Sequence, residues 1–120
     1  MAVKYTMRLD AGAHYFLQIT WKDPDGAAID LTGYTARMML RTKYADAAPL
    51  VSLTSEEGGG IEITAESGIL DITIDDTSTS ALASTGKETK GVYDLEVESS
   101  EGVVYRLLGG PWICAPEATK

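Results

Sequence analysis

The sequence predicts an all-β fold: an antiparallel immunoglobulin-like or Greek-key β-sandwich of about seven strands with one short helix. Two observations predict this class. Apolar and polar residues alternate along several short segments, and a cluster of Gly, Pro, Asp or Ser bounds each segment. A chain of 120 residues can bury one core but not two. We therefore expect a single domain over residues 1–120, with extended arms at 1–10 and 116–120 that become ordered against a partner.

The expected strands follow one another at short intervals. The strand at 15–21 ends at the sequence Asp23-Pro24-Asp25-Gly26, which we interpret as a β-turn, because apolar residues follow where a calcium loop needs further oxygen ligands. The other expected strands lie at 34–40, 51–53, 61–63 and 70–74, and in a final hairpin folded about residues 99–102. We expect the apolar faces of 15–21, 34–40 and 93–97 to form the shared core.

One short helix is expected at about residues 77–84. Asp75 or Asp76 would cap it, with Ala81 and Leu82 facing inward. The polar segment that follows would carry the chain from one sheet to the other. Near the end of the chain, Gly109-Gly110-Pro111 predicts a bulge or bend in the last strand.

The charge balance excludes two classes of partner. Eighteen acidic against ten basic side chains give a net charge of −8, which would be repelled by nucleic acid and by an anionic membrane surface. No apolar run approaches the ~20 residues needed to cross a bilayer. The amino terminus lacks the apolar region of a signal peptide, so we expect the protein to stay in the cytoplasm in which it is made until it is assembled.

The sequence offers no catalytic, cofactor or metal grouping that we would assign, so we expect a protein that is not an enzyme. Cys114 is the only cysteine, which rules out an intrachain disulfide, and its apolar surroundings predict a buried and inert thiol. The only histidine is His14, a hundred residues away in sequence. The adjacent acidic pairs at 56–57 and 75–76 are better explained by a loop and a helix cap than by acid–base chemistry.

Candidate contact residues are apolar or cationic side chains at unexpected positions. Alternation places Phe16 and Met39 on the outward faces of their strands, and Trp112 follows the interruption in the last strand. Arg37 and Arg41 share the outward face with Met39. Such apolar and guanidinium groups are enriched at protein interfaces, so these five residues are the expected interface.

Three segments carry a resemblance to a known class of protein. They are DLTGYTARMMLR from Asp30 to Arg41, YDLEVESSEGVVYRLLGG from Tyr93 to Gly110, and the ending APEAT from Ala115 to Thr119. In this order they resemble the motifs of short virion proteins of tailed bacteriophages, from tail, baseplate and fibre-attachment regions. The likeness runs from about Leu17 onward. In those proteins a single glycine commonly stands where this chain has Gly109, Gly110 and Pro111.

The resemblance implies a non-enzymatic virion structural protein, present in several copies as an adaptor of the tail, baseplate or fibre attachment. It would be made in the host cytoplasm and reside in the virion, and its partners would be other tail, fibre or capsid proteins. Two alternatives stay open at this point. One is a capsid decoration or cement protein, and the other is a carbohydrate-binding or receptor-recognition domain, which would explain the acidic, tyrosine-rich composition.

Overall fold

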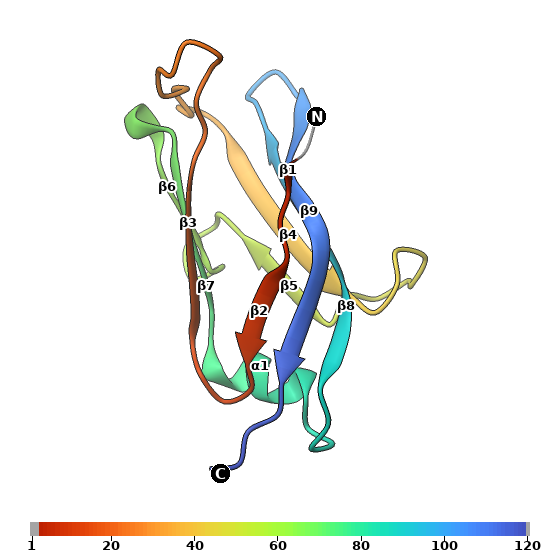
Figure 1. Cartoon of the computed structure of the whole chain (residues 1–120). Coiled ribbons are helices and arrows are strands. Elements are labelled where there is room, and N and C mark those ends of the chain that lie inside the picture. Colours follow the sequence, from red (N-terminus) through yellow and green to blue (C-terminus); the bar gives the residue numbers. More distant parts are fainter. Residues whose placement is uncertain (1–2, 120) are drawn as a thin grey trace.

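The computed structural model describes residues 3–119 and shows two β-sheets packed face to face (Figure 1). A single α-helix closes one end of the molecule. The strands are β1 (Val3–Lys4), β2 (Met7–Asp10), β3 (Tyr15–Thr20), β4 (Thr35–Arg41), β5 (Val51–Thr54), β6 (Ile61–Thr64), β7 (Ile69–Ile74), β8 (Thr89–Glu98) and β9 (Val104–Ala115). The helices are α1 (Asp76–Leu82) and the 3₁₀ turn η1 (Ala65–Ser67).

The topology is that of an immunoglobulin-like β-sandwich, as predicted. The large sheet has the order β1-β9-β8-β4-β5, and β2 also pairs with β9. The small sheet has the order β3-β7-β6. The pairings between these strands are antiparallel except those of β1 and β2, which run parallel to β9. These two amino-terminal segments raise the strand count above the expected seven.

The amino-terminal arm predicted at residues 1–10 forms, in its described part, the two strands β1 and β2 of the large sheet. Met7 and Leu9 are buried, with 0% and 2% of their surface exposed, and β2 contacts α1. The register along β9 is the same for β1 and β2, since Lys4 pairs with Gly109 and Met7 with Trp112. The segment is divided where it passes Pro111, which has no N–H to offer a neighbouring strand. Residues 1 and 2 lie outside the described residues.

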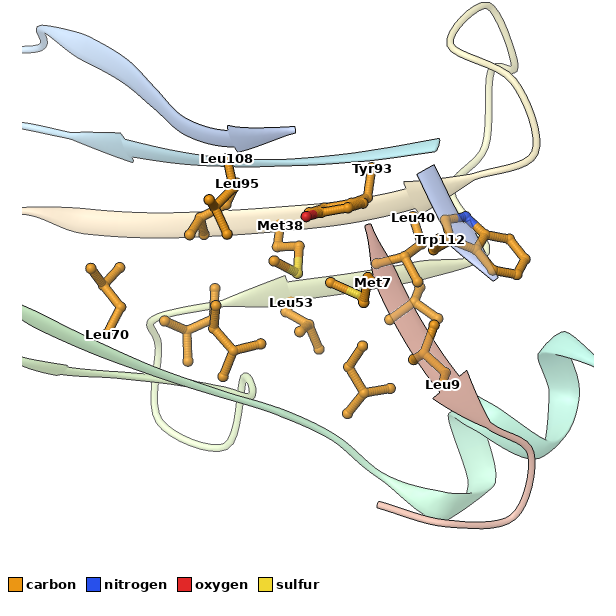
Figure 2. Close-up of a cluster of buried hydrophobic side chains, with 14 of the residues drawn as sticks. Met7, Leu9, Met38, Leu40, Leu53, Leu70, Tyr93, Leu95, Leu108 and Trp112 are labelled. Carbon is orange, nitrogen blue, oxygen red and sulfur yellow. The ribbon is translucent and has the colours of Figure 1, made fainter. Parts of the chain in front are cut away.

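The alternation read from the sequence has the correct phase on the three core strands. Ala36, Met38 and Leu40 of β4 and Tyr93, Leu95 and Val97 of β8 are all buried. Figure 2 shows Met7 and Leu9 of β2 pointing into the same cluster as Met38, Leu40 and Leu53. The core therefore extends under the amino-terminal segment, which the sequence interpretation had left outside it.

Helix α1 lies in the connection from the small sheet to the large one. Asp75 is its N-cap, and the Asp75 carboxylate accepts a hydrogen bond from the Ser78 amide at 2.8 Å. Leu82 is buried as expected, but Ala81 is exposed, and the second buried residue is Thr79. The Thr79 hydroxyl donates to the Ala13 carbonyl oxygen at 2.9 Å, which ties the helix to the segment joining β2 and β3.

The irregularity expected at Gly109-Gly110-Pro111 lies two residues earlier. Strand β9 pairs with β8 through all three of these residues, and the register shifts instead opposite Leu95 and Glu96, where Leu107 is the extra residue. Gly110 has another role. A side chain there would collide with the Tyr5 backbone, so glycine lets the segment between β1 and β2 lie close against β9.

The described end of the chain, residues 116–119, follows β9 without forming a further strand. The side chain of Glu117 lies against Gly12. Whether this arm becomes ordered against a partner stays a prediction, and Lys120 lies outside the described residues.

Candidate interaction surfaces

Metal ligands, membrane spans, the cysteine and the histidine are the first features of the described residues to consider. Within residues 3–119, no group of three or more His, Cys, Asp or Glu side chains could hold a metal ion. In the same part of the chain, no helix is long and apolar enough to cross a membrane. Cys114 is fully buried, and burial raises the pKa of its thiol. The His14 ring stacks on the Phe16 ring, with ring centroids 6.0 Å apart.

The five candidate contact residues lie in three different parts of the structure: on the outer face of each sheet and in the core. Phe16 lies on the outer face of the small sheet with 71% of its surface exposed, opposite Thr73 of β7. Arg37, Met39 and Arg41 lie on the outer face of the large sheet. Trp112 lies in the core. Trp112 is therefore wrong as an exposed contact. The other four candidates lie on two separate surfaces, because β3 and β4 belong to different sheets and their outward faces point away from each other.

Trp112 is buried because the chain makes room for it. Only 1% of its surface is exposed. A side chain at Gly91, its cross-strand neighbour on β8, would collide with the Arg41 carbonyl and with the indole ring. The indole N–H donates to the Arg41 carbonyl oxygen at 3.0 Å, which satisfies its only polar group. The sequence signal for burial was Gly91, a glycine inside a strand that permits a close approach.

The outer face of the large sheet carries a network of ion pairs, which we call the ionic ladder: Arg37, Asp94, Glu96, Glu98 and Arg106. Arg37 Nε lies 3.2 Å from Glu96 Oε1, and Arg37 Nη1 lies 3.0 Å from Glu98 Oε1. Arg106 Nε lies 3.5 Å from Asp94 Oδ2 and its Nη2 lies 4.0 Å from Glu96 Oε2.

The ladder acts on the acid–base properties of its members. The hydrogen bond to Glu98 is the main factor that raises the pKa of the Arg37 guanidinium. Burial, followed by repulsion from Glu96, raises the pKa of Asp94 above its ordinary value despite the nearby arginines. Arg37 thus has its partners within its own chain, which weakens the case for it as a contact to another protein.

Met39 and Arg41 are also engaged by the chain itself. Arg41 Nη1 donates to the Asp46 carbonyl oxygen at 2.7 Å, and its Nη2 lies 3.3 Å from the sulfur of Met39. Met39 is only half-buried, so it still presents apolar surface beside Tyr44, which is exposed in the loop after β4. The two side chains contribute the exposed apolar part of a hollow that charged residues also line, among them Arg41 and the ladder residues Asp94 and Arg106.

Besides Phe16, further large apolar side chains are exposed. The large exposed hydrophobic residues are Val3, Tyr5, Phe16, Tyr44, Leu50, Val103, Val104 and Tyr105. They fall on the small sheet, on the loop from 42 to 50, and on the β8–β9 hairpin end with the neighbouring amino-terminal segment. Val3 and Tyr5 belong to the segment at 1–10 that was expected to contact a partner as an arm, although neither was named as a contact residue.

The comparisons with known proteins identify the fold. No protein-family model matches the chain, and no curated protein matches its sequence. Among solved structures, a chicken TCR matches with a TM-score of 0.57 and 14% identity, over 95% of this chain and 54% of that chain. The chain therefore spans about half the length of that structure. A structure of Tim-1 matches with a TM-score of 0.51 and 14% identity, over 100% of this chain and 99% of that one. At such low identity, the likeness shows the immunoglobulin-like fold alone.

Proposed function

We propose that the protein is a non-enzymatic structural component of a bacteriophage virion, used in several copies as an adaptor of the tail, baseplate or fibre-attachment apparatus. Its partners are other virion proteins, which it meets after synthesis in the host cytoplasm. The resemblance of its sequence motifs to those of short phage virion proteins supplies this assignment. In support, charged residues of two of those motifs lie on neighbouring strands and form ion pairs with one another.

The observation that carries the proposal is that the motifs meet in space. Arg37 of the DLTGYTARMMLR segment lies on β4, Asp94 and Glu96 of the YDLEVE segment lie on β8, and Arg106 lies on β9. These strands are neighbours, and the same four residues are members of the ionic ladder. A motif whose conspicuous charges pair with one another specifies a rigid scaffold rather than a reaction centre.

An adaptor also needs more than one surface with which to join its neighbours. The exposed Phe16 lies on the small sheet, and Met39 with Tyr44 lies on the opposite side of the sandwich. Isolated apolar groups of this kind contribute little to the stability of the folded chain. At an interface from which water is excluded, each can contribute a few kcal/mol to association.

The test uses phage particles that carry the protein with an epitope tag. Purified virions are separated into heads and tails, and each fraction is probed for the tag. We expect the protein in the tail fraction; recovery in heads would favour a decoration protein, and absence from particles would overturn the proposal.

Single substitutions then locate the contacts. Because the structure separates the two positions, Phe16→Ser and Met39→Ser are made individually, with Thr73→Ser as a control beside Phe16. We expect each test variant to fold and to enter particles poorly, whereas the control enters normally. Normal incorporation of both folded variants would move the contacts to other surfaces.

A further inference from the structure

Strand β3 is an open edge of the small sheet. It pairs with β7 on one side, and within residues 3–119 no strand pairs with its other side. In constant-type immunoglobulin domains the amino-terminal strand belongs to the sheet that corresponds to this one. Here both amino-terminal segments join β9 of the large sheet instead, so the place beside β3 is left free.

The free edge exposes backbone groups at known positions. Residues of an antiparallel strand alternate between those that bond to the neighbour and those whose N–H and C=O point away from it. The Trp21 amide donates to the Gly68 carbonyl oxygen at 2.8 Å, on the β7 side, which fixes the phase. By alternation, the backbone groups of Phe16, Gln18 and Thr20 point to the free edge.

The inward side chains of β3 are incompletely covered. Tyr15, Leu17 and Ile19 are only half-buried, although the inward residues of the adjacent β7 are among the most deeply buried in the molecule. Those β7 residues are Leu70, Ile72 and Ile74. The space between the two sheets is thus partly exposed to solvent along β3, whereas it is fully covered at the adjacent strand β7.

Exposed apolar side chains of the large sheet border the same opening. The Tyr5 hydroxyl is close enough to Tyr15 to raise its pKa, although burial is the larger cause. The rings of Tyr105 and Trp21 have centroids 5.3 Å apart. Tyr5 and Tyr105 nevertheless keep 42% and 41% of their surface exposed. We call this border, together with the inward side chains of β3, the open seam.

Nothing in the sequence of β3 protects its edge. Tyr15–Thr20 reads YFLQIT, with no charge, proline or glycine, and is rich in residues that favour strands. The other edges are short or charged: β5 and β6 have four residues each, and β1 and β2 carry Lys4, Arg8 and Asp10. An unprotected edge beside uncovered apolar side chains is the arrangement that accepts an added strand.

We propose that the β3 edge binds an extended segment of another polypeptide, with apolar residues at alternate positions filling the open seam and Lys or Arg at the positions between them. The charge of the small sheet selects this partner. Its outer face carries Glu62 and Asp71 and, within the described strands, no Lys or Arg. A second copy would bring the same carboxylates and a net charge of −8, so a cationic segment is favoured over self-association.

This inference rests on the proposed function only for the origin of the segment, which would be an extended arm of a neighbouring virion protein. The binding property itself belongs to the isolated chain. The two can therefore fail separately.

The probe is a fluorescent nine-residue peptide of alternating valine and lysine, and binding is followed by fluorescence anisotropy. A peptide of the same composition in two blocks, all valine then all lysine, controls for charge alone. We expect the alternating peptide to bind and the block peptide to bind much more weakly. Equal binding of the two peptides, or binding of neither, would overturn the inference.

A matched pair of variants tests the edge. Gln18→Pro removes an N–H from the free edge, whereas Gln18→Ala removes the side chain and keeps that N–H. Both variants remove the hydrogen bond that the Gln18 side chain donates to Asp71 Oδ1 at 2.9 Å, so they are compared with each other. We expect Gln18→Pro to bind the alternating peptide about tenfold or more weakly than Gln18→Ala, as the loss of one or two hydrogen bonds implies. Equal affinities for the two folded variants would contradict the assignment of the edge.

Hydrogen exchange keeps the test valid if Gln18→Pro does not fold. In the wild-type protein, the alternating peptide should slow exchange of the Phe16, Gln18 and Thr20 amides. Unchanged exchange at these amides would overturn the inference. It would also be overturned if the wild-type protein formed a dimer in which the β3 amides are protected and did not bind the peptide.

Peptide binding by a protein absent from virions would refute only the proposed function. Normal incorporation of folded Gln18→Pro into particles would instead overturn the role of the edge in the virion.

Discussion

The outer face of the large sheet carries charged side chains that pair with one another, whereas the edge of the small sheet exposes apolar side chains and backbone groups. On the large sheet, Arg37 and Arg106 are paired with carboxylates of adjacent strands, so the charged groups of that face satisfy one another. On the small sheet, Phe16 is exposed beside an unpaired strand edge. In the first region the ladder charges are paired within the chain, while the second region has backbone groups and apolar side chains that are still available for pairing.

This difference separates residues that build the scaffold from residues that can join it to something else. The motifs that resemble phage virion proteins include the ladder, and the ladder explains them without a partner. The open seam includes residues on which no motif falls, such as Tyr5 and Tyr15. A contact surface is therefore to be sought where the fold leaves a pairing unmade, and substitutions in the two regions should have contrasting effects.

The sharpest contrast is between two aromatic residues first expected at the same interface. Trp112→Ala should lower the free energy of unfolding by about 3–5 kcal/mol, because it leaves a large cavity and an unpaired Arg41 carbonyl. Phe16→Ala should change it by less than about 0.5 kcal/mol, because the ring is exposed. Urea unfolding of both variants measures the difference. Similar losses would mean that Phe16 is covered in solution.

Two leucines compare the closed and open parts of the core. Leu95→Ala on β8 should cost about 2–5 kcal/mol, since Leu95 is fully buried. Leu17→Ala on β3 should cost less than about 2 kcal/mol, because the half-buried side chain has part of its surface in water already. Thermal unfolding of the two variants checks this order. A Leu17→Ala loss equal to that of Leu95→Ala would show that the seam is closed.

Tyr93 links the closed core to the amino-terminal segment. Its hydroxyl donates to the Tyr5 carbonyl oxygen at 2.6 Å, and burial, followed by the nearby Tyr5 and Tyr44 hydroxyls, raises the pKa of Tyr93 from 10.0 to about 12. The folded protein therefore holds this proton more tightly than the unfolded chain. Its contribution to stability is complete below about pH 10 and is lost as the pH rises to about 12.

We therefore expect the wild-type protein to lose stability steeply between pH 10 and 12. Tyr93→Phe should lower stability by about 1 kcal/mol at pH 7, through loss of the hydrogen bond, and should make the alkaline loss shallower. Urea unfolding across this pH range measures both effects. An unchanged alkaline slope would assign the titration to other groups, of which Tyr15 is the first to test, since burial also raises its pKa.

The sequence was sufficient where pattern alone decides the structure. Alternation placed the inward faces of β3, β4 and β8 correctly, and Asp75 was one of two caps proposed for the helix. These features depend on neighbours along the chain, so the local sequence contains the information.

It was insufficient where distant pairing decides. Met7 and Leu9 alternate correctly for a strand, but only parallel pairing with β9 makes that strand part of the core. Whether Trp112 points inward or outward depends on the register shift at Leu107. The sequence had predicted this irregularity at Gly109 and Gly110 instead. The separation of Phe16 from Met39 followed from sheet membership, which the residues of a single strand do not specify.

The smallest expected effect tests the ladder itself. Arg37→Met keeps most of the side-chain bulk and removes both ion pairs, at a side chain that is 40% exposed. Exposed pairs of this kind contribute less than about 1 kcal/mol, so we expect a small loss of stability in dilute buffer that shrinks further at high salt. Urea unfolding of wild type and variant at low and high salt measures it, with Lys43→Met, a change of an exposed cation in the loop after β4, as the control. A loss of several kcal/mol that persists at high salt would show that the ladder is held away from water, which would extend the covered surface on this face from Met39 and Tyr44 to the ladder.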